Sequence, residues 1–143
     1  MSDFKIDFFN LNISAPRIQK THTRIWLSDI IRSEKKRIRS VEINFIFCSD
    51  EYLLSLNQKF LDKQTLTDVI TFEYSEKGSI MGDIFISYER VKDNAKKFQQ
   101  KAQTELLRVM EHGILHLLGY KDKTPKEQKL MVQKENQYLA LYY

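Results

Sequence analysis

The segment His112–Asp122, HGILHLLGYKD, constrains the fold more than any other part of the chain. Two histidines four positions apart lie on one face of a helix, one turn above each other. Gly119 ends this helix, because glycine accepts the left-handed backbone of a C-terminal cap. The chain then turns back, so that Asp122 returns to the open side of the two imidazole rings. We therefore predict one metal site, formed by His112, His116 and Asp122.

The composition of this site favours zinc. Three protein ligands with one open position are typical of catalytic zinc, whereas structural zinc is usually closed by four ligands. The helix is apolar at most positions between 106 and 118 and should be buried. Two buried imidazoles without partners would be costly. One Zn²⁺ per chain is therefore favoured over a pair of ordinary core histidines.

The same spacing resembles that of metzincin zinc proteases, H-E-x-x-H-x-x-G-x-x-H, with Asp122 at the third-ligand position. Gly113 stands where these proteases have their general-base glutamate. Glu111 lies on the other side of His112, about 200 degrees around the helix from that position. A metalloprotease without the glutamate lacks its proton acceptor. The pattern therefore still predicts the metal site but argues against a peptidase.

Length and composition indicate a single globular domain over residues 1–143. Apolar residues make up 42% and charged residues 29% of the chain, which is ordinary for a globular protein with one core. No apolar run is long enough to span a membrane, and the N-terminus lacks a secretory pattern. Cys48 is the single cysteine, so no intramolecular disulfide forms. We expect a buried thiol and a cytoplasmic protein. No pattern indicates an oligomeric state.

The net charge of +4 permits a nucleic-acid partner without demonstrating one. The densest basic run spans residues 32–39. Two interpretations of this run stay open. It is either a solvated helix end, where cations suit the helix dipole, or a patch that contacts phosphates.

Hydrophobic periodicity predicts alternating strands and helices. Strands are predicted at 4–9, 41–47, 69–74 and 80–87, with the last two forming an antiparallel hairpin. Helices are predicted at 23–36, after the cap at 49–50, around 91–98, at 104–118, and from the capping box at 124–127. The residues predicted to face inward are Leu53, Leu56 and Phe60 in the second helix, Val91, Ala95 and Phe98 in the third, and Leu130, Met131, Tyr138 and Leu141 in the last. The sum is an α+β domain with one mixed sheet of about four strands, about five helices, and the metal site at the end of a central helix.

These residues resemble the YbeY family of metal-dependent bacterial endoribonucleases. HGILHLLGYKD resembles the family signature H-G-x-L-H-L-x-G-Y-D-H. Leu56-Asn57 followed by TDVITF at 67–72 resembles L-N…T-D-V-L-S-F, and MGDIFI at 81–86 resembles the strand G-D-I-x-I. The three blocks agree in order and spacing from about residue 45 onward. The resemblance implies a zinc-binding α+β fold and cleavage of single-stranded RNA. It further implies a role in 16S rRNA 3′-end maturation and quality control of the ribosome.

Two positions depart from the family pattern. The third ligand of the family is normally histidine, where this chain has Asp122, an acceptable zinc ligand that adds a negative charge. The family also has an arginine just after an aromatic residue that follows L-N, and here that residue is Leu61. The arginine is a phosphate-clamp candidate. The candidates that would replace its charge are Lys59, Lys63 and Lys121, although lysine does not reproduce a bidentate guanidinium.

The chemistry that follows is zinc-activated hydrolysis of an RNA phosphodiester. The attacking group, a water or the 2′-hydroxyl of the RNA, stays open. The further candidates for lining the cleft are Thr67, Asp68, Thr71 and Asp83, and the alternative for each of them is strand-edge hydrogen bonding. Tyr120 is a candidate for stacking an RNA base.

Two other functions stay open. A zinc-dependent hydrolase of a peptide or small molecule would have a deep apolar pocket. A non-catalytic, ribosome-associated RNA-binding protein would have a fourth protein ligand closing the metal site, and His22 shows no pattern that suggests it is that ligand.

Overall fold

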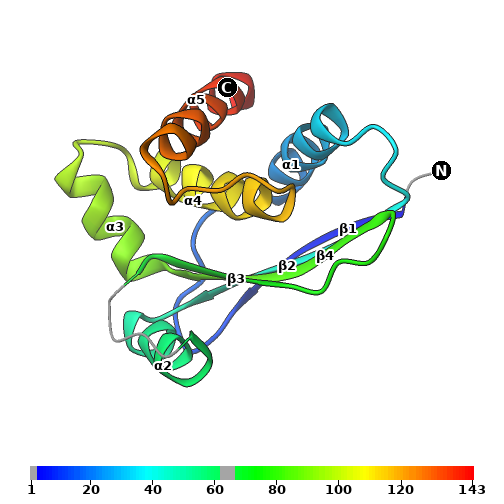
Figure 1. Ribbon diagram of the computed structural model, residues 1–143. Helices are drawn as coiled ribbons and strands as arrows, with labels where there is room; N and C mark the ends of the chain where they lie inside the picture. Colours follow the sequence, from blue (N-terminus) through cyan, green and yellow to red (C-terminus); the bar gives the residue numbers. More distant parts are fainter. Residues whose placement is uncertain (1–2, 62–66) are drawn as a thin grey trace.

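The computed structural model describes residues 3–61 and 67–143 and shows one sheet with helices on both faces (Figure 1). The strands are β1 (Asp3–Asn10), β2 (Ser40–Cys48), β3 (Val69–Glu73) and β4 (Ser79–Ser87). Their order in the sheet is β1-β2-β4-β3. β1, β2 and β4 are parallel, whereas β3 runs antiparallel to β4. The predicted mixed sheet and the hairpin are confirmed.

The helices are α1 (Lys20–Glu34), α2 (Asp50–Leu61), α3 (Tyr88–Lys97), α4 (Ala102–Leu117) and α5 (Pro125–Tyr142). α1, α4 and α5 lie on one side of the sheet and α2 lies on the other (Figure 1). α5 begins with the predicted capping box, in which Thr124 and Glu127 each satisfy a backbone N–H of the other. The predicted α+β class is confirmed. None of the described helices is both long and apolar enough to cross a membrane.

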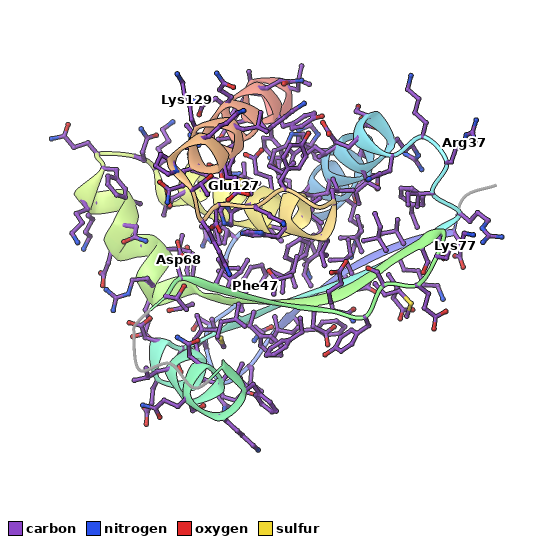
Figure 2. The ribbon with its side chains drawn as sticks, viewed as in Figure 1. Arg37, Phe47, Asp68, Lys77, Glu127 and Lys129 are labelled. Atoms are coloured by element: carbon purple, nitrogen blue, oxygen red, sulfur yellow. The ribbon has the colours of Figure 1, made fainter. Side chains whose placement is uncertain are left out.

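α4 packs directly on the sheet because Gly113 has no side chain. A Cβ at this position would lie 2.9 Å from Cδ1 of Ile84, which is fully buried on β4. Apolar side chains fill the space between the sheet and the helices (Figure 2). A glutamate at position 113 would have to displace this contact. The packing of α4 on the sheet therefore disfavours the metzincin general base at this position.

A second, smaller core lies between α2 and the sheet. It contains Cys48, Leu53, Leu56 and Ile70. Burial raises the pKa of the Cys48 thiol to about 12, so this cysteine is a small buried hydrophobe, as predicted.

Four of the side chains predicted to face inward are exposed: Phe60 (57%), Phe98 (62%), Leu130 (44%) and Leu141 (70%). Those predictions are wrong. Phe98 is the C-cap of α3 and precedes Gln99, whose φ of 54° takes the chain off the helical path. Leu130 and Leu141 lie one residue, about 100 degrees, off the buried face of α5. That face is formed by Met131, Glu135, Tyr138, Leu139 and Tyr142.

Glu111 is a buried acid on α4 that the metal centre does not use. It is fully buried, and neither of its carboxylate oxygens has a hydrogen-bond partner in the described part of the chain. Burial, with the nearby charge of Glu135, raises the pKa of Glu111 to about 9. The side chain is therefore protonated in the folded protein at neutral pH.

This raised pKa makes a prediction for stability. The folded state keeps the Glu111 proton up to about pH 9, whereas the unfolded chain releases it near pH 4.5. The free energy of unfolding should therefore fall as pH rises through this window, by roughly 3 kcal/mol between pH 5 and 7. In Glu111→Gln this contribution is absent. Urea unfolding of both proteins from pH 5 to 9 measures the difference, and Glu51→Gln, at an exposed carboxylate, should behave like the parent. Parallel pH profiles of the parent and Glu111→Gln would contradict it.

Candidate metal centre

His112 and His116 lie one turn apart on α4, and the turn after the helix brings Asp122 to the same place. The two Nε2 atoms are 3.0 Å apart, and each lies 3.3 Å from Oδ2 of Asp122. The side chains are 22%, 30% and 40% exposed, so the three atoms meet at the protein surface with one side open. The structure thus brings together the three residues predicted as metal ligands.

The distances fit a metal ion. Ligand atoms bound at about 2.0–2.1 Å in a tetrahedron lie about 3.3 Å from one another, close to the three separations observed. Three electron-pair donors that face one point repel each other unless a cation or a proton lies between them. Imidazole and carboxylate together suit a divalent transition-metal ion. The donor set therefore fits one such ion.

The turn that carries Asp122 forms because α4 ends in a Schellman motif. Gly119 has a φ of 105° and donates its N–H to the His116 carbonyl at 3.0 Å. The Tyr120 N–H donates to the Leu115 carbonyl, also at 3.0 Å. Only glycine adopts this φ without strain. The predicted helix stop is confirmed.

Glu34, at the end of α1, stabilises the same turn through hydrogen bonds. Its Oε1 accepts a hydrogen bond from the Tyr120 hydroxyl at 2.5 Å, and its Oε2 accepts from the Tyr138 hydroxyl and, at 3.2 Å, from Lys134 Nζ. Burial acts to raise the pKa of Glu34, but these hydrogen bonds outweigh it and lower the pKa. The cluster ties α1 and α5 to a residue two positions before Asp122. Stacking of a base on Tyr120 stays a prediction.

His112 is oriented by a carboxylate on α5. Its Nδ1 donates to Oε2 of Glu135 at 2.6 Å, and Arg108 donates to Oε1 of Glu135 at 3.1 Å. The Glu135 side chain is 7% exposed. With its proton held at Nδ1, His112 presents the Nε2 lone pair to the metal position. Burial lowers the pKa of His112, but the hydrogen bond and charge of Glu135, with smaller contributions from Asp122 and Asp68, raise it overall.

Glu135 and Arg108 were not predicted from the sequence. Glu135 does leave one trace there, because it stands four residues after Met131 and three before Tyr138, inside the apolar stripe of α5. An acid at such a position needs a buried partner. The sequence does not say which partner that is, since Glu135 and His112 are 23 residues apart.

Two cavities adjoin the metal centre, and Asp68, His112 and Asp122 border both. The larger, of about 480 Å³, is also lined by Thr67 and Thr71. Thr67, Asp68 and Thr71 therefore line the cleft, and Thr67 also makes the strand-edge hydrogen bond of the alternative interpretation, from its hydroxyl to the Val69 carbonyl at 3.2 Å. Burial raises the pKa of Asp68. Asp83 lies elsewhere, where its Oδ1 accepts a hydrogen bond from Asn44 at 3.0 Å.

Of the lysines proposed to bind phosphate, the two that the structure describes do not line these cavities. Lys59 on α2 and Lys121 in the turn are exposed, and neither is among the lining residues, while Lys63 lies outside the described residues. Their role stays a prediction. His22 pairs with the Tyr142 carbonyl at 2.6 Å, away from the metal centre. In the described part of the chain, no fourth histidine, cysteine or acid joins the three ligand candidates.

Comparison with known proteins assigns the family. The family Endoribonuclease YbeY matches residues 9–143. A curated relative from Cytophaga hutchinsonii with this name is 50% identical over 142 residues, covering 99% of this chain and 98% of the relative. The chain belongs to the endoribonuclease YbeY family. The family resemblance stated from the histidine segment is therefore confirmed.

Further relatives agree with this assignment. The family member from Flavobacterium psychrophilum is 47% identical over 135 residues, covering 94% of this chain and 95% of that protein. The solution structure of TM1509 from Thermotoga maritima is similar, with a TM-score of 0.62 and 30% identity, and the match covers 96% of this chain and 88% of that one. The fold agrees over nearly the whole length of both chains.

The contact between Glu135 and His112 makes the second prediction. Glu135→Gln keeps the shape of the side chain but removes the charge that orients and strengthens the imidazole. We expect the dissociation constant for Zn²⁺ to rise about 10- to 100-fold. Competition with a chromophoric chelator measures this value. Glu51→Gln, the same change at an exposed site, serves as the control, and parent-like Zn²⁺ affinity in Glu135→Gln would show that the contact is only structural.

The Glu34 cluster makes the third prediction. Tyr120→Phe removes a hydrogen bond that anchors the turn of Asp122, and we expect Zn²⁺ affinity to fall about 10-fold. Tyr138→Phe removes a hydrogen bond to the same carboxylate from a residue outside that turn, so it should lower stability while leaving Zn²⁺ affinity within about 2-fold. Chelator competition and urea unfolding separate the two effects. Equal loss of affinity in both variants would mean that the cluster acts through stability alone.

Proposed function

We propose that the chain is a Zn²⁺-dependent endoribonuclease that cuts single-stranded RNA. The observation that carries this proposal is the three-ligand centre, open on the side of two cavities, in a member of a family named for endoribonuclease activity. We also propose that it acts in the cytoplasm, on the ribosome, in 16S rRNA 3′-end maturation and quality control. The single domain of residues 1–143 carries the activity.

The chain supplies the ligands and the orientation. His112, His116 and Asp122 would hold Zn²⁺, which when bound supplies a Lewis acid and a nucleophile at neutral pH. Glu135 keeps the His112 proton at Nδ1, so that Nε2 stays free to bind. The carboxylate of Asp122 would be a strong donor to a bound ion, and its negative charge would lower the acidity of that ion relative to a third imidazole.

Asp68 is placed to move a proton. It borders both cavities beside the metal centre, and burial raises its pKa toward the range that suits a general base. Asn94 donates to its Oδ2 at 3.4 Å and fixes the carboxylate. Thr67 and Thr71 line the same cavity, where the Thr71 hydroxyl would contact the sugar or phosphate of the RNA, whereas the Thr67 hydroxyl donates to the Val69 carbonyl at 3.2 Å. We propose that Asp68 accepts the proton of the attacking hydroxyl.

Two alternatives fit the structure less well. A peptidase needs the general-base glutamate, and Gly113 has no room for one because α4 packs against Ile84. A purely structural metal needs a closed coordination sphere, and within the described residues only three ligand candidates meet. Both arguments favour a catalytic metal that acts on a substrate other than a peptide.

The fourth prediction tests the activity and the departure at Asp122 together. Zn²⁺-loaded protein should cut single-stranded RNA, act little on duplex RNA or casein, and lose cleavage on addition of chelator. Asp122→Asn should weaken Zn²⁺ binding at least about 10-fold, because it removes the charge, whereas Asp122→His should retain the ion. Gel-resolved cleavage and chelator competition give the two readouts, with Glu51→Gln as control.

Two results would contradict these statements separately. Robust proteolysis without RNA cleavage would replace the endoribonuclease with another hydrolase. Parent-like Zn²⁺ affinity in Asp122→Asn would remove Asp122 from the ligands.

A further inference from the structure

The smaller cavity beside the metal centre has the form of a ligand pocket. It measures about 310 Å³ and lies between α4 and α5, with the beginning of β3 on its rim. Val69, Val109, Met131 and Val132 give it apolar walls. Small-molecule sites in proteins have this size and combine apolar walls with a few placed polar groups. Two of the polar groups that line this cavity, Glu105 and Arg108, are on α4.

Glu105 is a buried acid of this cavity whose carboxylate has no hydrogen-bond partner among the described residues. The residue is 93% buried, with 7% of its surface exposed, and it lines this cavity. Among the described residues, none makes a hydrogen bond or ion pair with its carboxylate. Glu135 lines the same cavity but has both oxygens occupied, by His112 and Arg108. Since buried carboxylates are normally hydrogen-bonded, Glu105 is poised to accept donors from a ligand.

Arg108 adds donors beside this acceptor. It follows Glu105 by three residues, so the two side chains lie on the same face of α4, and both line the cavity. Two of its N–H groups are used, toward Glu135 and Asn136, at 3.1 and 3.0 Å. A guanidinium has five. The cavity therefore presents a two-oxygen acceptor and a cationic donor side by side between apolar walls.

We propose that this cavity binds a guanine base of the RNA, an inference that rests on the proposed endoribonuclease function. The Watson–Crick edge of guanine has two adjacent donors, N1–H and the 2-amino group, beside the acceptor O6. The donors match the two oxygens of Glu105, and O6 matches Arg108. Adenine and cytosine each offer the carboxylate one amino donor only. The apolar walls cover the faces of the ring, as in other single-strand binding sites.

The cavity lies beside the metal centre, so a base bound there would position the RNA for cleavage. His112 and Asp122 border the cavity as well as the metal centre. A base held there brings its own phosphate toward the open side of the two imidazoles. The larger cavity, which begins at the same residues, continues the path for the rest of the strand. Such a base pocket requires an unpaired nucleotide, which accounts for a preference for single strands.

Nucleoside binding tests the pocket apart from cleavage. Zn²⁺-loaded protein is titrated with guanosine, inosine, adenosine and cytidine, and the methyl resonances of Val109, Met131 and Val132 are followed by NMR. We expect guanosine to bind about 10-fold more tightly than inosine, which lacks the 2-amino group, and more tightly than the other two. Glu105→Gln should abolish the difference between guanosine and inosine, and Glu51→Gln should preserve it. Equal binding of guanosine and inosine to the parent protein would overturn the proposal without relying on any variant.

Mapping of cut sites separates this proposal from the proposed function. In a single-stranded RNA of mixed sequence, we expect cuts to cluster next to guanosines, and the cuts that Glu105→Gln still makes should be spread evenly over the four nucleotides. Even cutting by the parent protein would overturn the guanine pocket and leave the endoribonuclease intact. Selective guanosine binding without any RNA cleavage would support the pocket and overturn the nuclease.

Discussion

The hydrogen bond between His112 and Glu135 connects the metal centre to the rest of the fold. It spans α4 and α5, so the orientation of one metal-binding imidazole depends on how these two helices pack. α5 in turn begins at its capping box at Thr124, and Lys134 and Tyr138 join it to Glu34 on α1. Helix packing and ligand geometry are therefore one constraint. A change anywhere along α5 that rotates the helix would reach the metal through Glu135.

The interior around this contact is unusually acidic. Glu105, Glu111 and Glu135 are all buried on α4 and α5, and Asp68 lies close by at the start of β3. Arg108 is the cation that lines this side of the site in the described part of the chain. Burial, with the charges of Asp68 and Glu135, raises the pKa of Glu105, and the charge of Arg108 opposes this shift. A divalent ion at the histidines would offset part of that repulsion, so metal binding should be coupled to folding as well as to catalysis.

The parts of the structure that the sequence predicts are those encoded by neighbouring residues. The spacing of His112 and His116, the stop at Gly119 and the capping box at 124–127 are local patterns, and all three have the predicted structure. The same periodicity assigned Phe98 and Leu141 to the core, but both side chains are exposed. Phe98 lies where α3 ends, and Leu141 lies outside the buried face of α5. The hydrogen bonds of Glu135 with His112, and of Glu34 with Tyr120 and Tyr138, join residues that are 23 to 104 positions apart in the sequence. No local pattern specifies these partners.

The basic loops and the cavities beside the metal centre lie in different parts of the molecule. Arg37 and Lys77 lie in loops at the opposite end of the molecule from Asp68 (Figure 2). α1 ends at Glu34, so most of the basic run of residues 32–39 lies in the loop before β2. Cations at that distance attract an RNA strand through the long-range field without holding a phosphate at the metal centre. At the centre itself, the cavities are lined mainly by acids, hydroxyls and apolar side chains. A duplex backbone finds few partners on such a surface. Under the proposed function a single strand would do better, because it could turn its bases into the cavities.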